Sequence, residues 1–352
     1  MTARLVQYWP AAYTPSGWHV VFAIIAVLAV IVVVGFVAAG FLIARIRPGV
    51  VVRLVVWTCV VVGTVAMERL VADEPAGVRM VALILVTLTS MKGVVAVESR
   101  LRDGVRLAFI PWAAFAIGWF GMRPAAFVGV PHLGVPQRKD VPVTPLVVAG
   151  AVRFAAGAML VAFAWWLAHS PVVPLADTPR LCVATVVLMP GLSLMLHFGI
   201  FSWMVALWQR WGANVRPLFR APLVSRSLGE FWGQRWNLAF VEMTSIAVYR
   251  PLRTVAGERG ATVAVFLFSG VLHELAISLP VMAGFGLPTL YFALHAAAVS
   301  LERHWQGQGR PISERGVWSR VWTFGWIVLP LPILFHPPFI RGCIWPLLGV
   351  EG

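Results

Sequence analysis

Two short stretches of this chain place a polar side chain in or beside an apolar segment of membrane length. In residues 231–237, FWGQRWN, Asn237 comes just before a largely apolar run, and in residues 269–274, SGVLHE, His273 lies inside one. Polar groups at bilayer depth cost free energy and are usually functional. A neutral histidine can take a proton from a hydroxyl group near neutral pH. The two stretches therefore indicate an enzyme that works inside a membrane.

Further polar side chains that fall within apolar stretches are His197, Glu242, Glu274 and His295. The alternative for each is a structural role, in which the side chain bonds to a neighbouring helix. The residues alone leave both roles open for His273 and favour a packing role for His295, which has Glu302 two turns later on the same helix side. No spacing of these histidines fits a metal site, and position 277 is Ile where a zinc-peptidase motif needs a second ligand.

The composition decides the class of protein. The chain has 352 residues, of which 60% are hydrophobic and 12% charged, whereas a soluble domain averages about 25% charged residues. Only helices and closed barrels can span lipid, and the apolar runs here are continuous rather than alternating, which excludes a barrel. The predicted fold is an all-α integral membrane protein, a multi-span helical bundle that forms one membrane-embedded domain over residues 1–352.

The apolar runs predict about eight spans plus re-entrant or interfacial helices. We expect the spans at 20–43, 54–70, 80–97, 145–168, 181–207, 262–282, 287–301 and 321–348. The run at 107–120 is short and has basic flanks, which favours a re-entrant or interfacial helix, and the amphipathic run at 237–248 is expected to enter the membrane only partway. Arg45, Arg47 and Arg53 follow the first span and place its C-terminal end in the cytoplasm.

The net charge of +14, from 28 basic and 14 acidic residues, could indicate a nucleic-acid partner. The basic residues cluster between spans instead of forming one stripe, so we interpret them as the positive-inside bias of cytoplasmic loops and expect no nucleic acid. A plasma (inner) membrane location with basic loops in the cytoplasm follows. The tryptophans that flank the most basic loop are typical of an interfacial aromatic belt: Trp203, Trp208, Trp211, Trp232 and Trp236.

Three motifs in the C-terminal third resemble, in their order and spacing, the wax synthase branch of the membrane-bound O-acyltransferase (MBOAT) family. They are residues 231–237 (FWGQRWN), 248–253 (VYRPLR) and 268–274 (FSGVLHE), and the resemblance covers residues 227–302. Residues 90–93 (SMKG) resemble a weaker N-terminal feature of that branch. The family's bundle is normally longer than this chain. The tryptophan-rich block combined with the intramembrane His-Glu pair is specific, whereas neither part alone would be.

The resemblance implies transfer of an acyl group from a coenzyme A thioester to a hydroxyl, in a tunnel that coenzyme A enters from the cytoplasm. It implies that His273 is the catalytic histidine and Asn237 its polar partner, with Trp232, Trp236, Glu274 and His295 in supporting places. Acyl-CoA would be a co-substrate rather than a bound cofactor, and the acceptor a lipophilic alcohol. The arginines that could hold the nucleotide phosphates are Arg210, Arg216, Arg220, Arg226 and Arg235.

Other functions remain open at this point. The acceptor hydroxyl could belong to a sterol, a diacylglycerol, a glycan or a secondary metabolite, and the donor could be acetyl-CoA. A channel or transporter could use the same polar residues as a pathway, although the absence of inverted sequence halves is atypical of transporters. A membrane scaffold fits the paired motifs least.

Overall fold

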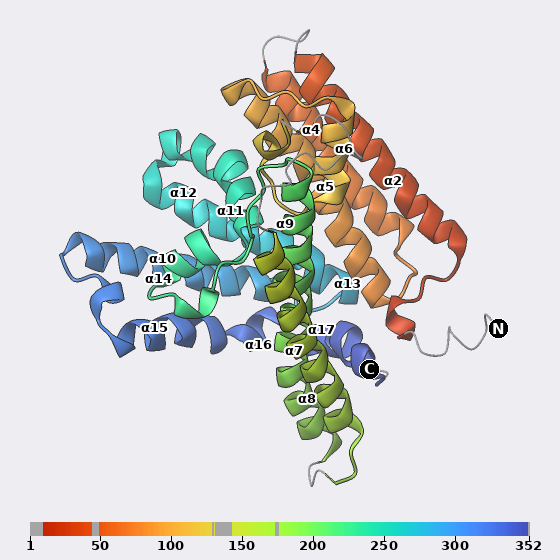
Figure 1. Ribbon diagram of the computed structural model, residues 1–352, viewed down its shortest axis with the longest axis vertical. Helices are drawn as coiled ribbons and strands as arrows, with labels where there is room; N and C mark the ends of the chain where they lie inside the picture. The colour runs from red at the N-terminus through yellow and green to blue at the C-terminus, as the bar shows by residue number, and fades with distance from the viewer. Residues whose placement is uncertain (1–9, 44–48, 129, 131–142, 173–175, 351–352) are drawn as a thin grey trace.

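Helices form all the regular secondary structure in the part of the chain that the computed structural model describes, residues 10–43, 49–128, 130, 143–172 and 176–350. Seven helical runs within these residues are long and apolar enough to cross a membrane. Lipid offers no hydrogen-bonding partners to an open backbone, so such runs cross it as helices. The chain is therefore an all-α, multi-span membrane protein, as its composition predicts (Figure 1).

The first three long helices pack together as one group (Figure 1). They are α2 (Trp18–Val37), which continues through the π-helix η2 (Ala38–Leu42), α4 (Val50–Leu70) and α5 (Ala76–Asp103). A β-carbon added to Gly35 of α2 would lie 3.3 Å from the Cα of Gly93 in α5. Small residues at such a crossing let two backbones approach closely, which is how helices associate where no hydrophobic effect drives them together.

A buried lysine holds the short helix α6 (Phe109–Gly118) against α5. The Lys92 ammonium group donates to the carbonyl oxygens of Trp119 at 2.8 Å and Gly121 at 2.5 Å. It also lies 4.0 Å from the centre of the Phe115 ring. A charge inside the protein is tolerated when hydrogen bonds and other favourable contacts surround it. The two carbonyl oxygens and the aromatic ring provide these contacts for Lys92.

The segment that follows α6 is also held by a carboxylate from the C-terminal half, because Glu242 Oε2 accepts the backbone N–H of Met122 at 3.0 Å. Helix α6 has 10 residues and is about 15 Å long, too short to cross a bilayer. The expectation that residues 107–120 do not span the membrane is confirmed.

Helices α7 (Thr144–His169) and α8 (Asp177–Ser193) form an antiparallel hairpin that projects from the rest of the molecule at the bottom of Figure 1. A β-carbon at Gly157 would lie 2.6 Å from the carbonyl oxygen of Gly191, so only glycine fits at this crossing. Helix α8 continues through the π-helix η4 (Leu194–Ile200) into α9 (Phe201–Arg210), which returns the chain to the centre of the molecule.

The C-terminal half supplies the elements around the two predicted motifs. In chain order they are α10 (Leu228–Glu230), the π-helix η6 (Phe231–Arg235), α11 (Leu238–Thr244), the π-helix η7 (Ser245–Tyr249), α12 (Arg250–His273), the π-helix η8 (Glu274–Ser278), α13 (Leu279–Val281), α14 (Leu287–Gly307), α15 (Val317–Val328), α16 (Leu331–Leu334) and α17 (Pro337–Phe339). Helix α12 is interrupted at Gly257, whose φ of 68° lies outside the helical region.

Short single-turn elements complete the described structure: η1 (Ala11–Tyr13), η3 (Pro124–Phe127), η5 (Pro222–Val224), η9 (Ile312–Glu314), η10 (Ile340–Ile344) and η11 (Trp345–Leu348). Figure 1 shows α12, α14 and α15 side by side on one flank of the molecule, opposite the group of α2, α4 and α5.

The structure corrects several expected span boundaries. The segments at 237–248 and 262–282 belong to one helical run, Leu238–Val281, and the last span is Val317–Leu334, which ends well before residue 348 because prolines follow it. Helix α14, expected as a span, is not among the seven apolar runs. Its inner face carries His295 and Glu302, which are 0% and 6% exposed, so this face of α14 packs against protein.

The helix of the expected third span is longer than the apolar run at 80–97. Helix α5 continues to Asp103, and Glu98, just past that run, is buried and paired with Arg53 at 2.6 Å. Arg53 itself lies in the first turn of α4, and its pair with Glu98 joins α4 to α5. Arg45 and Arg47, on which the orientation also depends, lie outside the described residues.

Candidate active site

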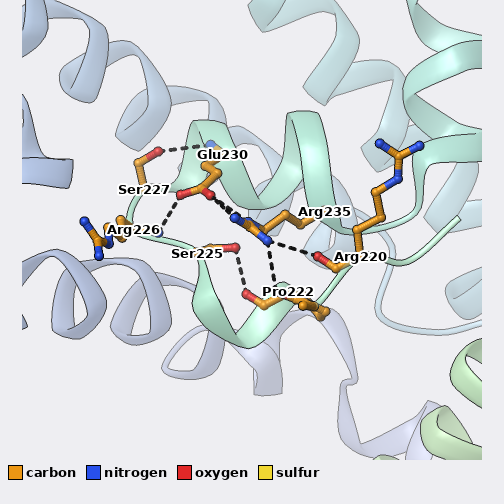
Figure 2. Close-up of polar contacts among 8 residues, drawn as sticks. Arg220, Pro222, Ser225, Arg226, Ser227, Glu230 and Arg235 are labelled. Atoms are coloured by element: carbon orange, nitrogen blue, oxygen red, sulfur yellow. Dashed lines mark hydrogen bonds and ion pairs between the residues drawn. The ribbon is translucent and has the colours of Figure 1, made fainter. Parts of the chain in front are cut away.

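The loop that leads into the FWGQRWN block is fixed by the carboxylate of Glu230 (Figure 2). Ser227 caps α10 by accepting the backbone N–H of Glu230 at 3.0 Å, which is the first half of a capping box. Glu230 accepts the backbone N–H of Arg226 at 2.8 Å and the Nε–H of Arg235 at 2.6 Å. Arg235 also donates to the carbonyl of Arg220 at 3.3 Å. The start of the block is therefore tied to the preceding loop at several points.

The aromatic side chains of the block form a continuous row through the protein. Trp236 stacks on Phe231 with ring centres 5.5 Å apart, and Phe231 meets Trp232 edge to face at 5.0 Å. Trp232 in turn contacts His295 at 5.4 Å and Phe292 at 5.7 Å. This corrects the expectation of an interfacial belt for Trp232 and Trp236, since both pack against the protein core.

Trp208 is a further correction to the predicted belt. It is 5% exposed, and its indole N–H donates to the carbonyl of Gly118 at 2.7 Å. Its ring meets that of Phe127 at 5.1 Å. An indole whose N–H is satisfied inside the protein packs as a core residue, so Trp208 joins the helices instead of lying at the lipid interface.

His273 is the last residue of α12, and one of its ring nitrogens has no hydrogen-bond partner among the described residues. Its Nδ1 lies 2.7 Å from the carbonyl oxygen of Ser269, which can only accept, so Nδ1 carries the proton and donates. In the neutral ring Nε2 is then the basic nitrogen. The ring rests against Phe292 of α14 at 4.4 Å and against Phe240 of α11 at 6.2 Å. The tautomer and ring plane of His273 are thus set by three different elements.

Glu274 holds α14 in place beside that histidine. Its Oε1 accepts the backbone N–H groups of Gly286 and Thr289 at 3.0 Å each and the hydroxyl of Thr289 at 2.8 Å. These backbone groups lie at the N-terminus of α14, where orphan N–H donors and the helix dipole favour a negative charge. The supporting place of Glu274 is therefore that of a helix cap, which fixes the helix carrying Phe292.

His295 lies one turn beyond Phe292 on α14 and is fully buried. Its Nδ1 donates to the carbonyl of Tyr291 at 2.8 Å, the same bond that His273 makes to the residue four positions earlier. Its Nε2 has no hydrogen-bond partner within the described residues, and neither does the nearby indole nitrogen of Trp232. His295 therefore packs against the FWGQRWN block, residues 231–237, which we call the signature block. Its Nε2 stays available as a hydrogen-bond acceptor.

Asn237 serves as the N-cap of α11. Its backbone is left-handed, with a φ of 46°, a conformation that asparagine tolerates better than most residues. Its side-chain oxygen accepts the backbone N–H of Phe240 at 3.3 Å. No hydrogen bond in the described structure joins Asn237 to His273, and Phe240 contacts both residues. The cap leaves the amide N–H₂ group of Asn237 available as a donor.

A third histidine joins the block from the other side. His197, in η4, stacks on Phe219 at 4.4 Å and meets Trp236 edge to face at 5.6 Å. Its Nδ1 lies 3.0 Å from the hydroxyl oxygen of Ser193. The sequence marks His197 only as one more polar residue in a span, because no spacing rule connects it to a block that follows more than thirty residues later. The tertiary structure places it beside Trp236, the neighbour of Asn237.

The five candidate phosphate-binding arginines differ in availability. Arg235 is engaged by Glu230, with an ion pair at 2.6 Å, and by backbone carbonyls. Figure 2 shows the guanidinium groups of Arg220 and Arg226 directed away from that network. Arg210, Arg216, Arg220 and Arg226 are exposed. Among the described residues no group of three or more His, Cys, Asp and Glu side chains is placed to hold a metal ion.

The region around these motifs matches known proteins. Residues 215–294 match the sequence model of the membrane bound O-acyl transferase family, and the match includes both Asn237 and His273. The chain is 35% identical over 141 residues to "Probable long-chain-alcohol O-fatty-acyltransferase 6" of Arabidopsis thaliana, which covers 37% of this chain and 40% of that protein. It is 28% identical over 141 residues to "Long-chain-alcohol O-fatty-acyltransferase" of Simmondsia chinensis, with the same two coverages.

These matches thus span 40% of the length of each of the two relatives. Residues 215–294 thus resemble the membrane bound O-acyl transferase family, and the curated relatives that the chain resembles are named as long-chain-alcohol O-fatty-acyltransferases. The match to the family ends one residue before His295.

Proposed function

We propose that this protein transfers a fatty acyl group from acyl-CoA to the hydroxyl of a long-chain alcohol and so makes a wax-type ester. One observation carries the proposal. His273, inside the segment that matches the acyltransferase family, has its Nδ1–H bound to the carbonyl of Ser269, so its basic nitrogen is free in an apolar setting. Residues 1–352 act as one membrane-embedded domain, with residues 227–302 supplying the site.

The reaction needs no bound cofactor. Nε2 of His273 takes the proton of the acceptor hydroxyl as the hydroxyl oxygen attacks the thioester carbonyl carbon. The carbon–sulfur bond then breaks, the acyl group remains on the alcohol oxygen as an ester, and the protonated imidazole returns its proton to the leaving thiolate. General-base assistance of this kind contributes roughly 10²–10⁴ in rate.

Asn237 is the proposed oxyanion donor. Its side-chain oxygen is engaged at the α11 cap, which leaves its N–H₂ group to donate to the oxygen of the thioester carbonyl as negative charge develops there. One such donor lowers the barrier by about 2.7–4 kcal/mol. Trp232, Trp236 and His295 support the site by packing around it, and Glu274 supports it by holding α14.

The proposed orientation follows the charge distribution. The loop from residue 210 to residue 235 is basic, which favours the cytoplasmic side and a place in the plasma (inner) membrane. Coenzyme A would then approach from the cytoplasm, and the exposed arginines of that loop would attract its phosphates. Exclusion of water by the surrounding helices would protect the thioester from hydrolysis.

The first test measures free thiol released from palmitoyl-CoA by purified protein, with and without hexadecanol. We expect alcohol-dependent release and an ester of the corresponding mass. His273→Ala should abolish release while the detergent-extracted protein remains monodisperse.

The matched control is His169→Ala, because His169 makes the same bond from Nδ1 to the carbonyl four residues earlier, at 2.9 Å, on the exposed α7. Near-normal turnover by His273→Ala would contradict the proposed role of the histidine. Thiol release that requires a sterol or a diacylglycerol instead of a fatty alcohol would change the acceptor and keep the reaction. Saturable ligand uptake without any thiol release would support a transporter.

A further inference from the structure

A hollow lined largely by tryptophan lies where α14 ends and α15 begins. It has a volume of about 420 Å³ and is lined by Trp305, Ile312, Arg315, Trp318, Val321 and Trp322. The rings of Trp305 and Trp322 meet at 5.0 Å, and the guanidinium carbon of Arg315 lies 5.7 Å from the centre of the Trp305 ring. Trp318 is 71% exposed, so one aromatic face of the hollow is open.

We propose that this hollow, formed by Trp305, Arg315, Trp318 and Trp322, binds the adenosine 3′,5′-bisphosphate end of the acyl-CoA donor. The inference rests on the proposed acyl transfer, since it assigns a place to the donor's nucleotide. It moves that place from the loop at residues 210–235 to the joint between α14 and α15.

The chemistry of the lining fits this ligand. Purine rings stack on indole faces, and a guanidinium beside the ring can hold phosphate oxygens. Arg315 is exposed and takes part in no ion pair within the described residues. Arg310, whose backbone N–H donates to the carbonyl of Trp305 at 2.9 Å, is exposed and likewise without an ion pair there. Arg315 therefore places a positive charge beside the Trp305 ring, and the backbone of Arg310 is bonded to Trp305.

The hollow is also coupled to the signature block. The indole N–H of Trp322 donates to Glu302 at 2.9 Å, and the same carboxylate accepts the backbone N–H groups of Leu228 and Gly229 at 2.7 and 2.8 Å. One wall of the hollow is thus bonded to the residues just before the block.

The separation along α14 suits the donor. Phe292, which contacts His273, and Trp305, which lines the hollow, lie on the same helix about 20 Å apart along its axis. The pantetheine arm and diphosphate of coenzyme A form an extended chain of this order of length, so a nucleotide in the hollow could present its thioester near His273.

The probe is adenosine 3′,5′-bisphosphate, which has no thioester and therefore reports binding without turnover. Its Kd is measured on purified full-length protein for the wild type, Trp318→Ala, Arg315→Ala and the conservative variant Trp318→Phe. Trp18→Ala is the matched control, because Trp18 is 76% exposed and belongs to α2, a helix on the opposite flank of the molecule from α15 in Figure 1.

We expect Trp318→Ala and Arg315→Ala to raise the Kd at least about fivefold, the fold-change of the weakest base–aromatic stacking contact. Trp318→Phe should recover most of the affinity and Trp18→Ala should bind like the wild type. With palmitoyl-CoA and hexadecanol, the effect should fall on the KM for the donor more than on kcat.

An unchanged Kd and KM in both variants would overturn the inference and place the nucleotide elsewhere, as would a wild type that does not bind the bisphosphate. If Trp318→Ala is no longer retained in anionic-lipid nanodiscs but binds the nucleotide like the wild type, the inference is also overturned, since Trp318 would then be a membrane anchor. If the wild type shows no turnover but the variants lose bisphosphate binding, the nucleotide site stands and the acyl-transfer proposal fails.

Discussion

Replacement of Glu302 tests how the signature block is held. Glu302 is 6% exposed, and its Oε1 accepts from the N–H of Leu228 and the indole of Trp322 while Oε2 accepts from the N–H of Gly229. In Glu302→Gln one oxygen becomes an N–H₂ group that faces a donor, so one hydrogen bond is lost. The other two change from charge-assisted to neutral bonds. Since a bond to a charged group contributes about 1.5–3 kcal/mol and a neutral one about half, we expect a loss of about 3–6 kcal/mol.

Glu302→Leu removes all three acceptors. Leaving a buried donor unpaired costs about 1–3 kcal/mol, so three donors give a loss of about 3–9 kcal/mol, reduced by the cost of burying the carboxylate that is no longer present. The assay is the temperature at which the detergent-extracted protein loses its monodisperse peak. The control is Glu258→Gln, because Glu258 is 71% exposed and its ion pair with Arg253 is 4.0 Å long, a kind of pair that contributes about 1 kcal/mol or less.

We expect the order of stability to be Glu258→Gln, then Glu302→Gln, then Glu302→Leu, with turnover lost in step for the two variants at Glu302. A Glu302→Gln variant as stable as Glu258→Gln would refute the reasoning, since it would mean that the three bonds do not hold the block.

The other predictions concern the roles of single polar groups. Asn237→Ala should lower turnover at least about tenfold; Asn237→Asp keeps the cap oxygen but has no N–H₂ group, so equal activity in Asn237→Asp and wild type would make the residue a cap only. Lys92→Met should lower thermal stability, because the carbonyls of Trp119 and Gly121 lose their donor, each bond to a charged group contributing about 1.5–3 kcal/mol; an unchanged melting temperature would show that the loop is held by other contacts. Burial by itself raises the pKa of Glu230, but the hydrogen bonds from Arg226 and Arg235 outweigh it and hold that pKa below its usual range. A carboxyl group whose pKa is lowered in the folded state stabilises the fold above its usual pKa. This stabilisation is lost as pH falls through the folded-state pKa. The stability difference between wild type and Glu230→Gln should thus be constant near neutrality, begin to shrink as pH falls below the usual carboxyl pKa of about 4.3, and vanish below the lowered folded-state pKa; a difference that persists at still lower pH would contradict it.

The chemistry-bearing residues were identifiable from the sequence because they conflict with their surroundings. Asn237 and His273 are polar residues in or beside apolar runs, and the aromatic block that ends at Asn237 is specific in combination with the His-Glu pair. The matched family segment contains both. Their roles in catalysis stay predictions, since the contacts show only that His273 is oriented and that Asn237 caps a helix.

The neighbours of these residues could not be predicted. His197 and Phe219 reach Trp236 from earlier in the chain, and ring contacts between distant segments leave no periodic signal in the sequence. Helix α14 was expected as an ordinary span, yet its buried histidine and carboxylate serve the signature block. Hydropathy alone reports the average polarity of a helix and does not tell which face meets lipid and which meets protein.

By itself the sequence determined the all-helical membrane class and the two motifs. Few backbone structures can span lipid, and an unpaired polar group costs free energy there. Only the tertiary structure decided that Glu274 caps α14, that Glu302 ties this helix to the signature block, and that His197 lies beside Trp236. The reason is physical. A polar side chain in a membrane must find a partner, but which partner it finds depends on how helices far apart in the chain are brought into contact.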